Sequence, residues 1–220
     1  MTILSIIKTT ATLPAPYAGQ YFVLFDLLNR AMSARMAPRI FKCVIGHDKE
    51  EGVFMNNKKL RWLTASAMIA AVYLVLTLIF YLTSFLPYQI RFAEVLTVLP
   101  YFTPLAVPGL FVGCVVANIL GGNGIWDVVI GSLATLIAAY VTYKLTYNKP
   151  GRKWLAPLPP VIVNVVMVGP MLSVLYKMPL FATMLSVGLG QVIACYVLGF
   201  PLMLLFENSK KLSELFKRFS

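Results

Sequence analysis

A single carboxylate, Glu94, lies inside a long apolar run and is the first candidate for a functional group. The run extends from Phe92 to Leu120, and Glu94 is its only charged residue. A charge at the centre of a bilayer costs about 2.5–3.5 kcal/mol, so a charge inside such a run indicates a partner or a ligand. Two interpretations are open. Glu94 could pair with Arg91, three residues earlier on the same helical face. Alternatively, it could accept a hydrogen bond from a ligand entering from outside or serve as that ligand's counter-ion.

Polar side chains in other apolar stretches offer further candidates. Asn164 and Gln191 are amides in apolar sequence, and Asn118 is a weaker example. Each could hold two helices together or read the edge of a heterocycle, because an amide is both donor and acceptor. Trp126 and Asp127 follow a glycine-rich loop. They could mark a helix start at the membrane interface, or the loop could fold over a ligand.

The sequence carries few signs of catalysis. It contains no GxxxxGK[ST] phosphate loop, so ATP hydrolysis by this chain is not expected. The only histidine is His47, and the three cysteines, Cys43, Cys114 and Cys195, lack the spacing of a metal site. We therefore predict no catalytic residue, no metal and no cofactor.

The composition places these residues in a membrane protein. Hydrophobic residues make up 59% of the chain and charged residues 12%, about half the usual share of charge. The net charge of +11 comes from basic residues gathered in short segments between apolar runs. That pattern is typical of membrane topology and does not favour nucleic-acid binding.

The run that contains Glu94 decides how many helices cross the membrane. As one helix it would extend about 43 Å, well beyond a hydrocarbon core of about 30 Å. Pro104 and Pro108 interrupt helical hydrogen bonding, so a tight turn near Thr103 to Pro108 should divide the run in two. The sequence then predicts a bundle of six transmembrane helices. The expected spans are 62–82, 92–104, 107–120, 126–144, 155–176 and 179–206.

The distribution of basic residues supports six spans with both termini cytoplasmic. The outer side would carry only Arg91 and Lys177. The inner side would carry eleven basic residues: Lys58, Lys59, Arg61, Lys144, Lys149, Arg152, Lys153, Lys210, Lys211, Lys217 and Arg218. Five spans would scatter these charges over both sides, against the positive-inside rule.

The two ends of the chain differ from this membrane domain, which is expected at 55–220. Residues 1–54 contain no convincing span or signal peptide, and we expect a poorly ordered or mis-assigned extension. Residues 209–220 have the pattern of a short basic amphipathic helix suited to the inner leaflet. In the first span Ala67 and Ala71 are four residues apart, with Ala70 beside them. This small-residue surface could dock another subunit or pack inside the bundle.

Three segments resemble the QueT family of queuosine-precursor transporters, and the resemblance extends over about 55–206. They are RFAEVLTVLP (Arg91 to Pro100), PLAVPGLFVGCVVANILGG (Pro104 to Gly122) and DVVIGSLATLIAAYVTY (Asp127 to Tyr143). The family pattern is Arg-x-x-Glu-Ala, and Val95 replaces its alanine here. The resemblance implies a substrate-binding S component of an energy-coupling-factor (ECF) importer in a bacterial plasma membrane. Such a subunit captures a deazaguanine-type precursor outside. It works with a transmembrane coupling subunit and two ATPases, which alone use ATP.

The same resemblance suggests where ligand and partner would bind. The coupling subunit would dock on Ala67, Ala70 and Ala71. The regions that hold ligand would contain Arg91, Glu94, Asn118, Asn123, Trp126, Asn164 and Gln191. A partly desolvated Glu94 would suit the cationic group of an aminomethyl precursor. Three other functions fit the same composition: a stand-alone transporter, a lipid enzyme using Glu94 and Asp127, and a scaffolding subunit without ligand.

Overall fold

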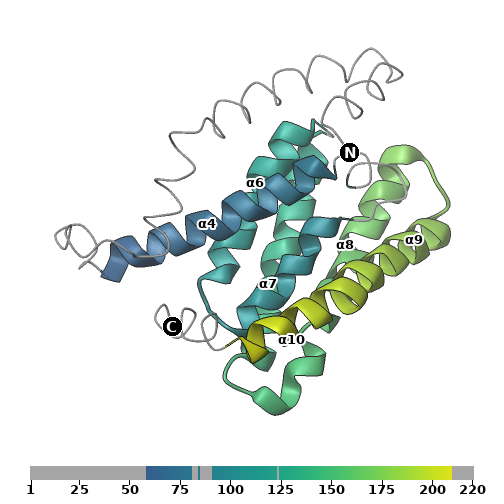
Figure 1. Ribbon diagram of the computed structural model, residues 1–220. Coiled ribbons are helices and arrows are strands. Elements are labelled where there is room, and N and C mark those ends of the chain that lie inside the picture. Colours follow the sequence, from purple (N-terminus) through teal and green to yellow (C-terminus); the bar gives the residue numbers. More distant parts are fainter. Residues whose placement is uncertain (1–57, 81–83, 85–90, 123, 210–220) are drawn as a thin grey trace, which may run out of the picture. The chain divides into compact units, whose positions relative to one another are not determined.

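The computed structural model describes residues 58–80, 84, 91–122 and 124–209, which belong to one unit, Asn57–Ser220. This part of the chain is helical and contains no strand (Figure 1). The expected extension at 1–54 and residues 210–220 of the expected tail lie outside it. In chain order the elements are α4 (Lys58–Ile79), η2 (Phe92–Tyr101), α6 (Ala106–Gly121), η3 (Asp127–Gly131), α7 (Ser132–Thr146), η4 (Pro150–Leu155), α8 (Leu158–Tyr176), α9 (Leu180–Val192), η5 (Ile193–Gly199) and α10 (Phe200–Asn208).

Four helical stretches among these residues are long and apolar enough to cross a membrane. They are Trp62–Ile79, Asp127–Thr146, Pro150–Tyr176 and Leu180–Asn208. Helices η2 and α6 are apolar but shorter, extending about 20 Å and 24 Å at the rises of 3₁₀- and α-helices. The predicted all-helical membrane class is therefore confirmed, while the count of six spans stays a prediction.

The proline-rich run is divided where the sequence predicted. Helix η2 ends at Tyr101 and α6 begins at Ala106, so the turn includes Pro104. Pro108 lies in the first turn of α6, where its missing N–H would have no helical partner in any case. The last apolar run, 179–206, contains Pro201 but is not divided by a turn. Its segment η5 is a π-helical stretch that ends at Gly199, two residues before Pro201. A wide turn of this kind accommodates a proline without ending the helix.

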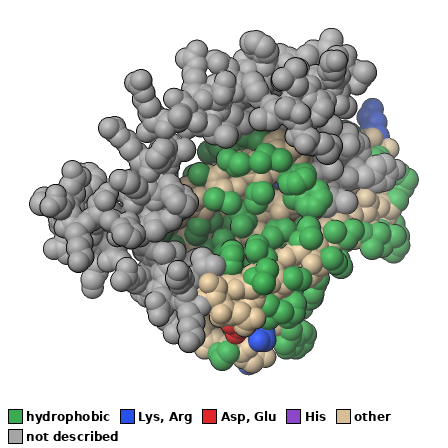
Figure 2. Space-filling model, viewed as in Figure 1, with side chains coloured by type: hydrophobic (Ala, Val, Ile, Leu, Met, Phe, Trp, Pro, Cys, Tyr) green, Lys and Arg blue, Asp and Glu red, His purple; other side chains and the backbone are tan. Residues whose placement is uncertain are grey.

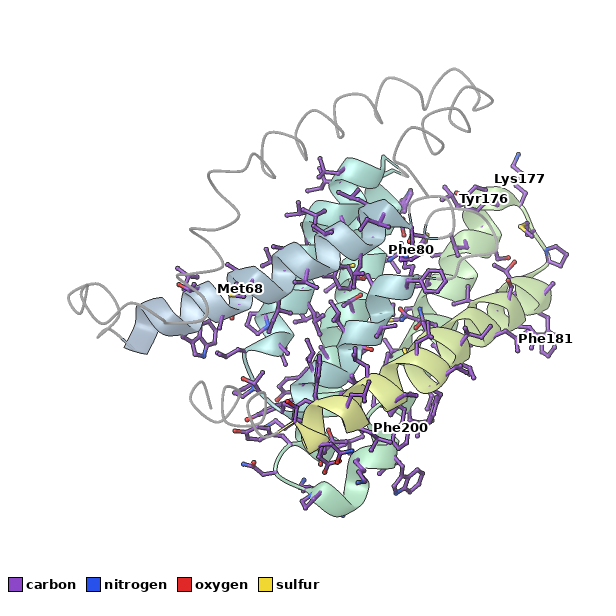
Figure 3. All side chains as sticks on the ribbon, in the orientation of Figure 1. Met68, Phe80, Tyr176, Lys177, Phe181 and Phe200 are labelled. Atoms are coloured by element: carbon purple, nitrogen blue, oxygen red, sulfur yellow. The ribbon has the colours of Figure 1, made fainter. Side chains whose placement is uncertain are left out.

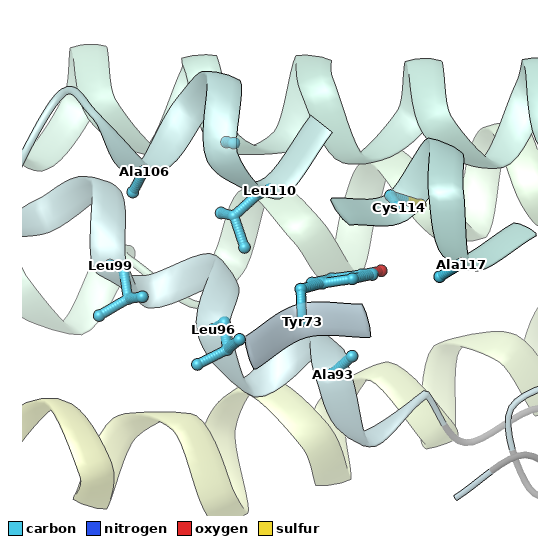
Figure 4. Packing of buried hydrophobic residues seen from close by; sticks show 9 residues of the cluster. Tyr73, Ala93, Leu96, Leu99, Ala106, Leu110, Cys114 and Ala117 are labelled. Atoms are coloured by element: carbon cyan, nitrogen blue, oxygen red, sulfur yellow. The ribbon is translucent and has the colours of Figure 1, made fainter. Parts of the chain in front are cut away.

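Helix η2 lies at the centre of the described bundle. It packs against α4, α6, α7, η5 and α10, and seven of its ten residues are buried, Glu94 among them. Figure 4 shows apolar side chains of α4, η2 and α6 meeting around the Tyr73 ring. The bundle therefore encloses the short helix that carries the candidate carboxylate.

Two glycines bring α4 and α6 into close contact. A Cβ atom at Gly109 would lie 2.7 Å from the carbonyl oxygen of Ser66, and one at Gly113 would lie 2.9 Å from that of Ala70. The backbones thus approach as in small-xxx-small packing. Of the three alanines, Ala70 contributes to this internal contact, whereas Ala67 and Ala71 are exposed on the opposite side of α4.

We expect Gly113→Ala to destabilise the bundle by about 1–3 kcal/mol, the usual cost of overpacking. The new methyl group would meet the Ala70 backbone and the Tyr73 Cβ atom at 2.9 Å, and neither can move without shifting α4. The measurement is the thermal unfolding midpoint of the purified protein. Gly151→Ala is the matched control, since nothing lies within 4 Å of its added Cβ. Equal midpoints for the two variants would show that the helices can separate without cost.

The outer surface of the described residues is mainly apolar along its length and charged near its ends. Hydrophobic side chains make up much of the surface of the described residues that is visible in Figure 2, and Phe181 is 83% exposed (Figure 3). At opposite ends of the Pro150–Tyr176 stretch lie Lys177 and the ion pair of Lys153 with Glu207, whose Nζ–Oε2 distance is 3.2 Å. An apolar band between charged ends is suited to a bilayer.

Candidate functional site: a buried polar cluster around Glu94

Glu94 is the centre of a polar cluster inside the bundle. Its side chain is 1% exposed. The Tyr73 hydroxyl, from α4, donates to its Oε1 atom at 2.8 Å, and the Thr135 hydroxyl, from α7, donates to the same oxygen at 3.3 Å. Both donors are neutral, so they orient the carboxylate without cancelling its charge.

The other carboxylate oxygen differs from Oε1. Among the described residues, Oε2 of Glu94 has no hydrogen-bond partner, and neither has the amide nitrogen of Asn164. Asn164 is 3% exposed and its side chain interacts with Glu94. A buried polar group left without a hydrogen bond costs about 1–3 kcal/mol. This acceptor and donor can therefore gain more from a ligand than a satisfied pair could.

Arg91 is paired with Asp127, not with Glu94. Its Nη2 atom lies 2.8 Å and 3.0 Å from the two carboxylate oxygens of Asp127, and the residues are 5% and 1% exposed. One of the two interpretations of Glu94 paired it with Arg91; the ion pair of Arg91 is instead with Asp127, because Arg91 precedes η2 in an extended conformation, off its helical face. The Arg91 carbonyl instead accepts a hydrogen bond from the backbone N–H of Glu94 at 3.0 Å. The ion pair thus anchors the backbone from which Glu94 projects.

Asn118 and Gly131 complete the surroundings of Asp127. The Asn118 amide donates to the Asp127 carbonyl oxygen at 3.0 Å. A Cβ atom at Gly131 would lie 3.1 Å from that amide nitrogen and 3.2 Å from Oδ1 of Asp127, so glycine leaves room for the cluster. Asp127 does stand at the start of a helical stretch, as expected, but its carboxylate has a specific partner. Trp126 is 61% exposed, in keeping with the expected interfacial position.

Both described cysteines also belong to the cluster. The Cys195 thiol lies 3.5 Å from the side-chain oxygen of Gln191 and 3.6 Å from the backbone oxygen of Glu94. The Cys114 sulfur lies 3.4 Å from the Thr135 hydroxyl and accepts a hydrogen bond from the Asn118 amide, also at 3.4 Å. The Cys195 thiol therefore lies between the side chain of Gln191 and the backbone of Glu94. Within the described part of the chain, no three His, Cys, Asp or Glu side chains form a group that could hold a metal.

The structure brings most of the predicted ligand residues into one cluster, although ligand contact by any of them stays a prediction. The residues brought together are Arg91, Glu94, Asn118, Asn164 and Gln191. Trp126 lies on the surface and Asn123 lies outside the described residues. Tyr73 and Thr135 were not predicted as site residues, because single hydroxyl side chains in apolar runs resemble ordinary packing residues. Tyr73 could have been found from its spacing on α4, since it follows Ser66 and Ala70 along one face.

Comparison with known proteins identifies the family. A family model described as QueT transporter matches residues 63–208, which is about two thirds of the chain and includes every member of the buried cluster. No curated protein and no solved structure matched. The chain is therefore a member of the QueT transporter family.

Proposed function

We propose that this protein captures a deazaguanine-type queuosine precursor outside a bacterial cell. It would then pass the precursor on with a transmembrane coupling subunit and two cytoplasmic ATPases. Membership of a transporter family gives the class of function. The observation that carries the finer proposal is the buried pair of Glu94 Oε2 and Asn164 Nδ2, which lack hydrogen-bond partners among the described residues. A carboxylate beside an amide suits a planar heterocycle with polar hydrogens on its rim.

The proposed topology has six crossings with both termini in the cytoplasm. The ion pair of Arg91 and Asp127 joins the start of η2 to the start of the η3–α7 stretch. This contact fits the six-span topology, in which these are the second and fourth spans and both begin on the same side of the membrane. Lys153 and Glu207 join the start of the η4–α8 stretch to the end of α10. The positive-inside rule assigns this second, lysine-bearing end to the cytoplasm, so Glu94 lies nearer the outer side.

The proposed docking surface for the coupling subunit is the exposed side of α4. Ala67 and Ala71 are exposed there, and larger apolar residues continue the same row at four-residue intervals. The row consists of Leu63, Ala67, Ala71, Val75 and Ile79. Small residues in its middle would let another helix approach closely. Ala70 was also predicted to share this surface; it is half-buried, and its backbone lies against Gly113 of α6.

A calorimetric titration of the purified chain tests the proposed function. Aminomethyl- and cyano-deazaguanine are the ligands, with guanine and riboflavin as controls. We expect saturable binding of a deazaguanine, no response to riboflavin, and uptake in cells that stops when the partner ATPases are removed. Absence of deazaguanine binding would refute the substrate. Uptake that persists without the ATPases would instead indicate a stand-alone transporter.

A further inference from the structure

The charges in the buried cluster do not cancel. Arg91 and Asp127 form one ion pair with an N–O distance of 2.8 Å. Among the described residues, the neutral side chains of Tyr73 and Thr135 donate to Oε1 of Glu94, and the neutral side chain of Asn164 also interacts with it. Arg91 also attracts Glu94, yet one guanidinium cannot balance two carboxylates. With all three groups ionised, the enclosed cluster would carry one excess negative charge.

An excess charge at this depth is costly. Glu94 and Asp127 are each 1% exposed, and transferring an uncompensated ion from water to such surroundings costs several kcal/mol. A buried carboxylate avoids that cost by binding a proton or a cation. Without ligand, the proton is the only cation that water can always supply.

The groups that face Glu94 among the described residues do not supply the positive charge that would compensate its carboxylate. Among the described residues, the titratable side chains that join Arg91 and Glu94 in the cluster are Tyr73 on α4, Cys114 on α6, Asp127 on η3 and Cys195 on η5. Tyrosine and cysteine ordinarily ionise above neutral pH and would add negative charge, not remove it. The facing side chains from α7 and α8, Thr135 and Asn164, do not titrate. The Glu207 carboxylate on α10 lies at the other end of η2, 3.5 Å from the Tyr101 hydroxyl.

We infer that the site takes up a ligand with one positive charge in exchange for the proton on Glu94, so that the aminomethyl precursor is preferred over its neutral cyano counterpart. This inference rests on the proposed function and names the member of the ligand class. On binding, the proton leaves Glu94 for solvent. The ligand's ammonium then lies against Oε2, the oxygen without a hydrogen-bond partner among the described residues. The cluster is neutral before and after the exchange, so the bundle never encloses the bare charge.

Because a proton leaves Glu94 on binding, the affinity for the aminomethyl ligand should depend on pH. A proton on Glu94 competes with the ammonium, so affinity should fall as the pH is lowered, by up to about tenfold per pH unit. The cyano ligand needs no proton to leave, and its affinity should stay level over the same range. Comparison of the two ligands on the wild-type protein requires no variant that could fail to fold.

The test is isothermal titration calorimetry of the full chain in detergent, with each ligand, between pH 5.5 and 8. Each titration is repeated in phosphate and in Tris, because these buffers take up protons with different enthalpies. We expect the aminomethyl ligand to release up to about one proton, seen as a buffer-dependent enthalpy. We expect no proton release with the cyano ligand. Glu94→Gln should abolish the release, whereas Glu207→Gln, at the partly exposed pair with Lys153, should retain it.

Three outcomes are distinguishable. Proton release confined to the aminomethyl ligand and dependent on Glu94 supports the inference. Tight binding of the aminomethyl ligand with the same enthalpy in both buffers overturns the inference and leaves the proposed function standing. No saturable binding of either deazaguanine overturns both.

Discussion

Asp127→Ala is expected to lower the free energy of unfolding by about 3–5 kcal/mol, the largest stability effect among the changes considered. The substitution removes the carboxylate that the Arg91 Nη2 atom contacts at 2.8 Å and 3.0 Å, at a guanidinium that is 5% exposed. It also removes the anchor of the backbone that carries Glu94. The measurement is thermal unfolding of the purified protein, together with the yield of monodisperse protein after solubilisation.

Two controls separate loss of the buried pair from general damage. Glu207→Ala breaks an ion pair whose side chains are 40% and 32% exposed, and it should cost no more than about 1 kcal/mol. The double variant Arg91→Met, Asp127→Leu removes both charges and should recover much of the stability, because the penalty comes from removing one partner of a buried ion pair and keeping the other. If the double variant is as unstable as Asp127→Ala, the penalty comes from lost packing and not from the broken ion pair.

The sequence predicted the helical membrane class and the long apolar helices because the signals for them are local. Apolar length identified the long helices, and the proline spacing predicted the break between η2 and α6 to within a few residues. Such signals depend on hydrogen bonding and on solvent, which act over a few residues. The glycines that join α4 to α6 were overlooked, although Gly109 and Gly113 show the same four-residue spacing that was noticed for Ala67 and Ala71.

The site was harder to predict because its partners are distant in sequence. Arg91 and Asp127 are 36 positions apart, and Tyr73 is 21 positions from Glu94. Helical spacing made the nearer pair, Arg91 with Glu94, one of two open interpretations, but the spacing rule holds only if both residues are helical. Arg91 lies one residue before η2 begins. The amides Asn118, Asn164 and Gln191 were recognisable as candidates because any polar group in an apolar span needs a partner.

The burial of Glu94 also changes the expectation for its chemistry. A carboxylate near the membrane surface could remain hydrated and ionised. Its substitution would then reduce the affinity for a ligand only slightly. Glu94 is enclosed and fixed at Oε1 by two donors, which leaves Oε2 for any incoming group. In such surroundings a charge-assisted hydrogen bond is about twice as strong as a neutral one. Glu94 is therefore the residue at which substitution should affect the charged ligand most.

Glu94→Gln is expected to weaken binding of the aminomethyl ligand by at least about 30-fold, or about 2 kcal/mol, the lower end of the cost of removing one partner from a buried charge pair. Glutamine keeps the shape of the side chain and one acceptor oxygen but cannot neutralise an ammonium. The cyano ligand should therefore lose less than about fivefold, since its neutral contacts need only the acceptor. The dissociation constants of both ligands are measured on both proteins.

Tyr73→Phe is the matched control for this comparison. It removes the hydroxyl that donates to Oε1 at 2.8 Å and leaves the carboxylate itself in place. Loss of that donor should weaken the aminomethyl ligand by a smaller factor than Glu94→Gln does, because the carboxylate that meets the ammonium is still present. The cyano ligand should be affected least, because a hydrogen bond to the carboxylate favours the ionised form that only the charged ligand needs. Equal losses for both ligands in Glu94→Gln would remove Glu94 as a counter-ion and leave it the role of a hydrogen-bond acceptor. A loss confined to the aminomethyl ligand would show that the enclosed charge selects the substrate.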